Sequence, residues 1–273
     1  MSTRDEVIDV AVGDARLAAT LVTPATSLPA VLFLHGWGGS QSQYITRARQ
    51  VAALGFVCLT LDFRGHEKTI AQKETVTRED NLQDVVAAYD VLAAQPTVDP
   101  SSIAVVGTSY GGYLGAILTS LRPVRWLGLR APALYKDSDW DAPKLKLRQM
   151  QSLATYRQQR VPVQGNRALE ACAAFRGDVL VVESGKDIVI PHTVIESYRD
   201  ALRDARSLTY RLLDDADHAL SDPSCCEAYT SMLVNWLTEM IAGWRVPDAG
   251  KQALVRQGMK AQATPQPQTA DAS

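Results

Sequence analysis

The sequence has few of the features that mark membrane, disulfide-rich or nucleic-acid-binding proteins. Only four of its 273 residues are cysteine, and no two of them form a C-x-x-C pair, so neither a zinc site nor a dithiol redox centre is expected. No apolar run approaches the roughly 18 to 20 residues that span a bilayer. The 28 basic and 30 acidic side chains nearly cancel, and no basic cluster occurs. Nucleic acid and membrane are therefore not the expected partners.

The amino terminus and the histidines exclude two further classes. After residues 1–6, acidic residues interrupt the apolar ones, so the continuous apolar block of a secretory signal is not seen. We therefore expect no secretory signal and predict a cytoplasmic location. The four histidines include no H-E-x-x-H and no pair at ligand spacing. We therefore expect no metal and no cofactor.

Hydrophobic patterning predicts an α/β protein. Residues 7–21 alternate between apolar and polar positions around Gly13-Asp14, which favours an antiparallel hairpin. Continuous apolar strands then alternate with amphipathic helices; the strands are expected at residues 30–34, 56–61, 103–106, 126–129, 179–182 and 208–213. Strands that are apolar on both faces and joined by helices predict a mostly parallel, doubly wound sheet.

We predict a single domain over residues 1–246. Residues 131–177 contain no strand signal but a helical stretch at 144–156, which predicts a short helical cap inserted at the functional edge. A packed helical excursion without a role in binding is the alternative. The last helix is expected to end at Gly243, and residues 247–273 have almost nothing to bury, so a disordered tail is predicted.

A candidate nucleophile stands at a strand-to-helix junction. Gly107-Thr108-Ser109-Tyr110-Gly111 is a G-x-S-x-G pattern between the strand at 103–106 and a helix that begins near Tyr110. In this context the tight turn presents the serine in a strained, exposed conformation, and the glycines leave room for the turn. The pattern alone is common, and a simple turn serine is the alternative reading of Ser109.

Serine needs a base that removes its proton and an acid that orients the base. His218 follows the last predicted strand and precedes the last helix, which is the expected place for the base. Asp187 lies just beyond the strand at 179–182 and is the predicted acid. The order Ser109, Asp187, His218 is nucleophile, acid, base. Three aspartates after the preceding strand are weaker candidates for the acid: Asp137, Asp139 and Asp141.

Stabilising a tetrahedral oxyanion requires two N–H donors. The first predicted donor is the backbone N–H of Tyr110, directly after the nucleophile. The second is the N–H of Trp37, in the glycine-rich loop His35-Gly36-Trp37-Gly38-Gly39 after the first buried strand. A phosphate-binding loop is the competing interpretation, but neither G-x-G-x-x-G nor a Gly-Lys-Ser/Thr ending is present. His35 is then expected to hold the loop by hydrogen bonds.

Taken together, these motifs make the chain resemble an α/β-hydrolase over about residues 7–243. The resemblance rests on five motifs: His35-Gly36-Trp37-Gly38-Gly39, Asp62-Phe63-Arg64-Gly65-His66, Gly107-Thr108-Ser109-Tyr110-Gly111-Gly112, Gly185-Lys186-Asp187 and Asp217-His218. The serine followed by Tyr-Gly-Gly-Tyr is similar to the acylaminoacyl-peptidase branch, whereas the compact length is similar to dienelactone hydrolases and small esterases. Dienelactone hydrolases carry cysteine where Ser109 stands, and Glu67 replaces a glycine that many relatives have.

The resemblance and the residues together imply a serine hydrolase that cleaves a carboxylic ester of a small-molecule acyl substrate. A substrate pocket is predicted around Gly36, Tyr135, Trp140 and Tyr156, although these aromatics could equally belong to the core. A peptidase, a thioesterase, an acyltransferase or a C–C bond hydrolase would use the same groups. A non-catalytic ligand-binding module is the alternative from another class.

Overall fold

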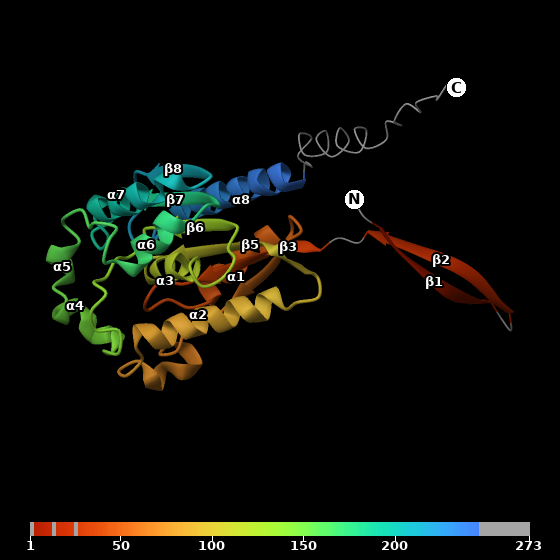
Figure 1. Cartoon of the computed structure of the whole chain (residues 1–273), viewed down its shortest axis with the longest axis horizontal. Helices are drawn as coiled ribbons and strands as arrows, with labels where there is room; N and C mark the ends of the chain where they lie inside the picture. Colours follow the sequence, from red (N-terminus) through yellow and green to blue (C-terminus); the bar gives the residue numbers. More distant parts are fainter. Residues whose placement is uncertain (1–2, 13–14, 25–26, 246–273) are drawn as a thin grey trace, which may run out of the picture.

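Six parallel strands form the central sheet of the protein (Figure 1). The computed structural model describes residues 3–12, 15–24 and 27–245. In the order in which they lie side by side, the strands are β4 (Val57–Thr60), β3 (Leu28–Leu34), β5 (Val98–Thr108), β6 (Trp126–Arg130), β7 (Asp178–Ser184) and β8 (Ser207–Leu213). All five neighbouring pairs are parallel, which confirms the predicted fold class.

A separate two-stranded sheet precedes this one. β1 (Thr3–Val12) and β2 (Ala15–Pro24) pair antiparallel in a continuous register from Thr3 opposite Pro24 to Val12 opposite Ala15. The alternating pattern around Gly13-Asp14 thus forms the hairpin that it predicts.

Helices cover both faces of the six-stranded sheet. One face packs against α1 (Ser42–Ala52) and α8 (Pro223–Arg245), and the other against α2 (Arg78–Ala93), α3 (Tyr110–Leu118), α6 (Arg167–Ala174) and α7 (His192–Ala201). Alternate residues of each strand enter opposite cores: Leu32 packs on the α2–α3 side, and Val31 and Phe33 pack on the α1–α8 side. Burial on both faces is the physical reason why these strands are continuously apolar.

The cap region differs in detail from the expectation. The predicted helix at 144–156 is divided into η2 (Lys144–Lys146), α4 (Leu147–Met150) and α5 (Leu153–Tyr156). The division occurs because Ser152 adopts a left-handed conformation, with φ 48°, which a continuous helix does not allow. The region also contains α6 and no strand.

The carboxyl-terminal end of the described chain also corrects one expectation. α8 does not end at Gly243 but continues to Arg245, because a glycine weakens a helix by only about 1 kcal/mol and does not by itself stop it. The predicted tail at 247–273 lies outside the described residues. No helix within the described ranges is both long and apolar enough to cross a bilayer. The two remaining short helices are η1 (Glu67–Gln72) and η3 (Leu202–Asp204).

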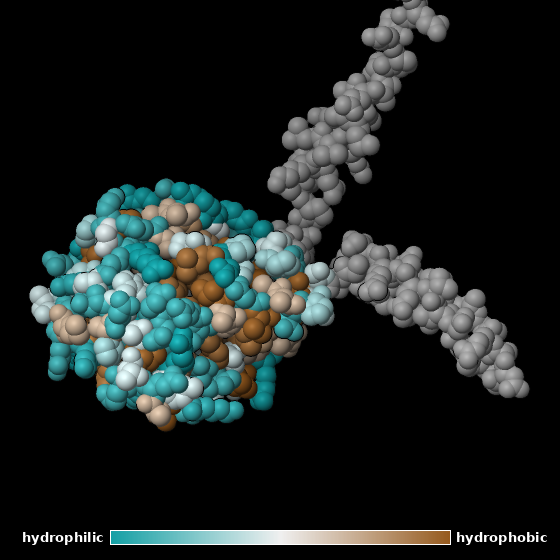
Figure 2. Space-filling view, turned by 60° about the horizontal axis from the view of Figure 1, so that its bottom comes forward, coloured by the Kyte–Doolittle hydropathy of each residue, from teal (hydrophilic) through white to brown (hydrophobic). Residues whose placement is uncertain are grey.

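Hydrophobic side chains on the face drawn in Figure 2 gather in separate patches between hydrophilic ones. The most exposed of the large hydrophobic side chains in the described part is Ile188, which is 98% exposed. It lies in the loop after β7, one residue after Asp187.

Candidate active site

The loops that carry the predicted site residues meet at one edge of the sheet. The strands are parallel, so the loops after β3, β5, β6, β7 and β8 all leave at their carboxyl ends. β3 lies between β4 and β5, and the chain therefore winds in opposite directions on the two sides of this point. Reversals of this kind open a crevice at the carboxyl ends of the strands, where ligands bind in open α/β sheets.

Ser109 occupies a strained turn between β5 and α3. Its backbone has φ 52° and ψ −115°, a conformation that residues with a side chain rarely adopt. A Cβ on Gly107 would lie 2.4 Å from the carbonyl oxygen of Gly111, so only glycine permits the chain to turn this closely. The backbone of Ser109 is anchored by its N–H, which donates to the carbonyl of Arg130 at 3.0 Å. The hydroxyl is therefore presented by a rigid support.

A chain of hydrogen bonds joins the three predicted residues. The Oγ of Ser109 lies 3.0 Å from Nε2 of His218, and Nδ1 of His218 lies 2.7 Å from Oδ2 of Asp187. The other carboxylate oxygen, Oδ1, accepts the backbone N–H groups of Val189 and Ile190, each at 2.8 Å. Both oxygens of Asp187 are thus occupied, and Oδ2 is held toward the imidazole.

The surroundings of Asp187 keep this carboxylate ionised. Burial raises its pKa, since the side chain is only 2% exposed, but the hydrogen bonds from His218 and from the N–H groups of Ile190 and Val189 outweigh burial and hold the pKa below its usual value. An ionised carboxylate accepts a hydrogen bond from Nδ1–H of His218, which leaves Nε2 free to accept the hydroxyl proton of Ser109.

Hydrogen bonds between neighbouring loops fix the acid and the base relative to each other. Gly185 N–H donates to Leu213 O at 2.8 Å, and Lys186 N–H donates to Ala216 O at 2.9 Å. The guanidinium of Arg130 donates to the carbonyl oxygen of His218 at 2.8 Å. The loop after β7 and the loop after β8 therefore form one unit that is tied to the end of β6.

The glycine-rich loop after β3 passes directly beside the serine. A Cβ on Gly36 would lie 3.3 Å from the Cβ of Ser109. Two N–H groups of this loop are occupied, since Gly38 donates to Nε2 of His66 at 2.9 Å and Gly39 donates to Gly36 O at 3.0 Å. The N–H of Trp37 has no acceptor among the residues that the structure describes.

The N–H of Tyr110 is free for a similar reason. It is the first N–H of α3, and the first N–H groups of a helix have no acceptor within the helix. No acceptor elsewhere in the described chain takes its place. The N–H groups of Trp37, in the loop beside Ser109, and of Tyr110, the next residue in the chain, are thus two available donors, and the positive end of the α3 dipole adds to the second.

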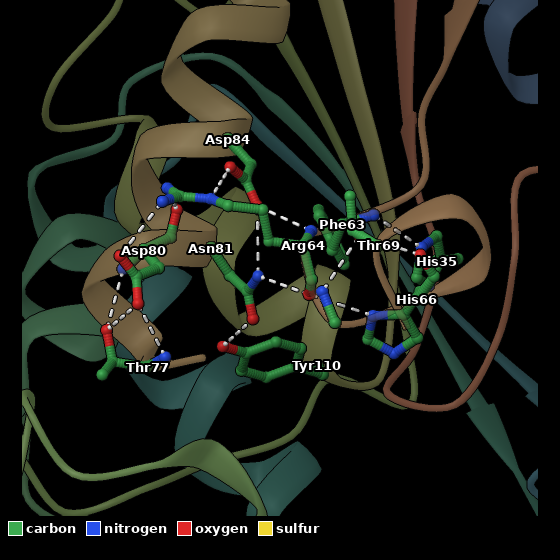
Figure 3. Close-up of polar contacts among 11 residues, drawn as sticks. His35, Phe63, Arg64, His66, Thr69, Thr77, Asp80, Asn81, Asp84 and Tyr110 are labelled. Carbon is green, nitrogen blue, oxygen red and sulfur yellow. Dashed lines mark hydrogen bonds and ion pairs between the residues drawn. The ribbon is translucent and has the colours of Figure 1, made fainter. Parts of the chain in front are cut away.

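Two neutral histidines hold this loop (Figure 3). Nε2 of His35 accepts the N–H of Phe63 at 3.1 Å, and Nδ1 of His35 donates to Gly36 O at 2.7 Å. Burial lowers the pKa of His35 to about 4, and burial also lowers the pKa of His66. His35 thus makes the hydrogen bonds of the supporting role expected for it, and His66 is a second support that the sequence did not identify.

A polar network extends from these histidines to helix α2 and back to the serine turn (Figure 3). Arg64 pairs with Asp84 at 2.6 Å and with Asp80 at 3.1 Å. Asn81 donates to the carbonyl of Arg64 at 3.1 Å and accepts the hydroxyl of Tyr110, also at 3.1 Å. The loop after β4 and the start of α3 are thereby fixed to the same helix.

A cavity of about 370 Å³ opens beside the serine. Its lining includes Gly36, Ser109 and His218, together with Arg47, Arg130 and Tyr229. Of the four residues predicted to bind substrate, Gly36 lies in this lining, whereas Tyr135, Trp140 and Tyr156 do not.

The three aromatic residues pack within and against the cap. The rings of Tyr135 and Tyr113 contact each other with centroids 4.9 Å apart, and Tyr135 is 4% exposed. Trp140 stacks on Tyr113 at 6.3 Å, and the hydroxyl of Tyr156 accepts the side-chain N–H of Asn166 at 3.1 Å. These side chains pack against or hydrogen-bond to neighbouring residues of the protein, which is why they do not line the cavity.

The alternative acids lie away from the imidazole. Asp137 accepts the N–H of Arg167 at 2.5 Å, and Asp139 bonds to Ser138 at 2.6 Å. Asp141 is exposed. Among the described residues, no three His, Cys, Asp or Glu side chains are grouped as ligands of a metal ion.

Sequence reasoning missed the basic lining of the cavity. Arg47 comes from α1 and Arg130 from the end of β6, and both are buried. A signal existed for Arg130, because it is the last residue of a buried strand and such a position faces the functional edge. No signal existed for Arg47, which stands in an ordinary amphipathic helix.

Comparisons with known proteins support the resemblance. A family model described as the alpha/beta hydrolase fold matches residues 29–129. An uncharacterised protein of Mycobacterium tuberculosis is 30% identical over 176 residues, which cover 64% of this chain but only 58% of that protein. The matched region is therefore less than two thirds of this relative's length.

Solved structures of both predicted branches are similar to the chain. The dienelactone hydrolase from Anabaena variabilis has a TM-score of 0.54 and 20% identity, with 87% of this chain and 98% of that chain covered. The acylaminoacyl peptidase of Pyrococcus horikoshii has a TM-score of 0.57 and 15% identity, with 87% of this chain and 42% of that chain covered. These matches confirm the resemblance that the motifs predict.

Proposed function

Because the chain has the α/β-hydrolase fold, we propose that it is a serine hydrolase that cleaves carboxylic esters through Ser109, His218 and Asp187. The observation that carries the proposal is the continuous hydrogen-bonded chain from Oγ of Ser109 through the imidazole of His218 to the buried carboxylate of Asp187. The strained backbone of Ser109 supports it, since such strain concentrates at functional sites.

In the first half-reaction, Oγ of Ser109 attacks the ester carbonyl carbon while Nε2 of His218 takes the hydroxyl proton. The charge that develops on the carbonyl oxygen is stabilised by the N–H groups of Trp37 and Tyr110. Each such donor contributes about 3 to 4 kcal/mol to lowering the barrier. The tetrahedral intermediate then collapses, His218 returns the proton to the leaving alcohol, and an acyl-enzyme remains on Ser109.

In the second half-reaction, water replaces the alcohol. Nε2 of His218 removes a proton from the water, the resulting hydroxide attacks the acyl carbon, and the carboxylic acid leaves as Oγ of Ser109 recovers its proton. Asp187 keeps its charge throughout, orients the imidazole and stabilises the imidazolium in both steps. The balance of the reaction requires only ester and water.

The test combines labelling and turnover. A fluorophosphonate probe is expected to label the protein, and Ser109→Ala is expected to abolish both labelling and hydrolysis of 4-nitrophenyl acetate. Ser120→Ala is the matched control, because Ser120 is an exposed serine just beyond the carboxyl-terminal end of α3. Undiminished labelling of the Ser109→Ala protein would contradict the proposal.

Cleavage of short peptides, thioesters or acyl transfer to another alcohol would use the same three side chains. A panel of 4-nitrophenyl esters, aminoacyl-naphthylamides and thioesters distinguishes these reactions. We expect the highest kcat/KM for the esters; faster turnover of the naphthylamides would favour a peptidase.

A further inference from the structure

The cavity beside Ser109 contains two buried guanidinium groups. Arg47, on α1, is 7% exposed, and Arg130, at the end of β6, is 4% exposed. Both line the same cavity as Ser109 and His218. A cavity for neutral, apolar esters would not need either charge, because apolar side chains of similar size would fill these positions at lower desolvation cost.

The protein contacts of Arg47 leave its charge uncompensated. Its Nε donates to the hydroxyl of Thr230 at 3.1 Å, and its Nη2 lies 3.6 Å from the thiol sulfur of Cys226. Its guanidinium carbon lies 4.7 Å from the centre of the Tyr229 ring and 5.4 Å from that of Tyr44. All of these partners are neutral.

Arg130 is in a similar state. It donates to the hydroxyl of Ser184 at 3.1 Å and to the carbonyl of His218 at 2.8 Å, and its guanidinium carbon lies 5.7 Å from the centre of the Tyr229 ring. Within the part of the chain that the structure describes, no carboxylate forms an ion pair with Arg47 or Arg130. The ring of Tyr229 therefore faces two buried cations and no anion.

Other arginines of the protein show that the pair is unusual in its placement. Arg64 and Arg206 each contact an aspartate. Arg78 and Arg157 are also buried without a carboxylate partner, and backbone carbonyls accept from them as one does from Arg130, but neither lines the cavity. Of the buried arginines in the described ranges that lack a carboxylate partner, Arg47 and Arg130 are the two that line the cavity containing Ser109.

We infer that Arg47 and Arg130 form a carboxylate subsite beside the nucleophile, so that the preferred substrates are small esters bearing a second, ionised carboxylate. The inference rests on the proposed ester hydrolysis and adds the substrate class. Guanidinium groups present N–H donors in a planar fork that matches a carboxylate, and charge-assisted hydrogen bonds of this kind are the strong ones. Burying an unpaired charge is unfavourable, and the carboxylate of a substrate would offset this cost.

The volume of about 370 Å³ restricts the size of such a substrate. It lies near the lower end of the range of ligand pockets, about 300 to 1,000 Å³. The carboxylate must therefore stand only a few bonds from the scissile ester, as in monoesters of short dicarboxylic acids or in acyl esters of small hydroxy acids.

Arg47 is the residue to change, because Arg130 also holds the backbone of His218. The first substrate pair is monomethyl succinate and methyl 4-oxopentanoate, in which a methyl ketone replaces the carboxylate on the acyl side. The second is acetoxyacetate and acetoxyacetone, which make the same exchange on the alcohol side. Hydrolysis of each ester is measured by pH-stat titration. The quantity compared is the ratio of kcat/KM for the charged ester to kcat/KM for the neutral ester.

We expect the wild-type ratio to exceed 10 in at least one pair, and Arg47→Gln to lower it at least tenfold. Arg47→Lys is expected to recover part of the ratio, since it restores the charge without the fork. Arg49→Gln is the matched control, because it removes the same charge from an exposed position of α1 and leaves the ratio unchanged. An unchanged ratio in a folded Arg47→Gln protein would overturn the subsite.

A binding measurement separates this inference from the proposed function. Calorimetric titration with succinate needs no turnover, and we expect the Arg47→Gln protein to bind it at least tenfold more weakly than the wild type. Equal affinities would refute the subsite. Weaker binding by the variant, combined with no fluorophosphonate labelling and no ester turnover of the wild type, would refute the proposed hydrolysis while supporting the subsite.

Discussion

Replacing Asp187 by asparagine tests the geometry of the site most directly. The substitution keeps the size of the side chain but removes a charge 2.7 Å from Nδ1 of His218. Asparagine also has the wrong donors. If its oxygen faces His218, its NH₂ group must face the N–H groups of Val189 and Ile190, which donate to the carboxylate in the native protein. If the side-chain amide is flipped instead, its NH₂ group donates to Nδ1 of His218, so the imidazole proton must be on Nε2.

The size of the effect follows from the electrostatics. Two unit charges about 4 Å apart interact by about 4 kcal/mol at an effective dielectric constant of about 20. Because about 1.4 kcal/mol corresponds to a factor of ten, losing the stabilisation of the imidazolium alone lowers kcat by about 10³. The second orientation of the amide removes the base from Ser109 and increases the loss, so we expect a decrease of about 10³ to 10⁴.

The assay is the kcat for 4-nitrophenyl acetate at neutral pH, with folding checked by circular dichroism. Asp215→Asn is the control, because Asp215 lies on the adjacent loop, is 80% exposed and forms an exposed ion pair with Lys186; we expect its kcat to stay within about twofold of the wild type. If Asp187→Asn keeps more than a tenth of the wild-type kcat, or if Asp139→Asn alone loses turnover, the assignment of the acid is wrong.

Three further predictions concern the framework of the site. Gly111→Ala would place a Cβ 2.4 Å from a backbone carbonyl of β3, so we expect a loss of more than 2 kcal/mol of unfolding free energy in urea titrations; wild-type stability would show that the turn can relax. The pKa of His35, lowered to about 4 by burial, means that only the unfolded state takes up this proton as the pH falls from about 6.5 to 4, so stability should fall by up to about 3 kcal/mol over this interval and level off below it. His35→Gln should remove this part of the pH dependence, and an unchanged slope would show that His35 is not its source. Thr77→Ala removes the hydroxyl that caps α2 by accepting the backbone N–H of Asp80, while the backbone N–H of residue 77 can still donate to the Asp80 carboxylate. It should cost about 1 kcal/mol by thermal unfolding, whereas the exposed Thr75→Ala should cost almost nothing; equal effects would argue against the cap.

Much of the site could be located from sequence because local chemistry and topology act together. The glycines around Ser109 predict a tight turn that only glycine permits, and continuous apolar runs predict buried parallel strands. Parallel strands send their following loops to one edge, so residues after different strands must converge. That reasoning is sufficient to bring Ser109, Asp187 and His218 to one place from positions far apart in the chain.

The substrate pocket was less accessible to this reasoning. Aromatic residues such as Tyr135, Trp140 and Tyr156 often line pockets, but the residue type alone does not tell whether the ring faces a cavity or packs against neighbouring side chains. In the structure the rings of Tyr135 and Trp140 contact Tyr113, the hydroxyl of Tyr156 bonds to Asn166, and none of the three lines the cavity. Likewise, the helix expected at 144–156 divides at Ser152, whose left-handed backbone no helical periodicity reveals.

Local patterns were enough to predict the strands, their order along the chain and the three side chains Ser109, Asp187 and His218, because turn chemistry and strand burial act over a few residues and parallel strands send their loops to one edge. The meeting of Arg47 and Arg130 around Tyr229 beside Ser109 is evident only in the folded protein. These residues come from α1, β6 and α8, and their contact depends on how two helices pack against one face of the sheet. Side-chain packing across such distances is set by the shapes of all the neighbours together, and no local pattern encodes it.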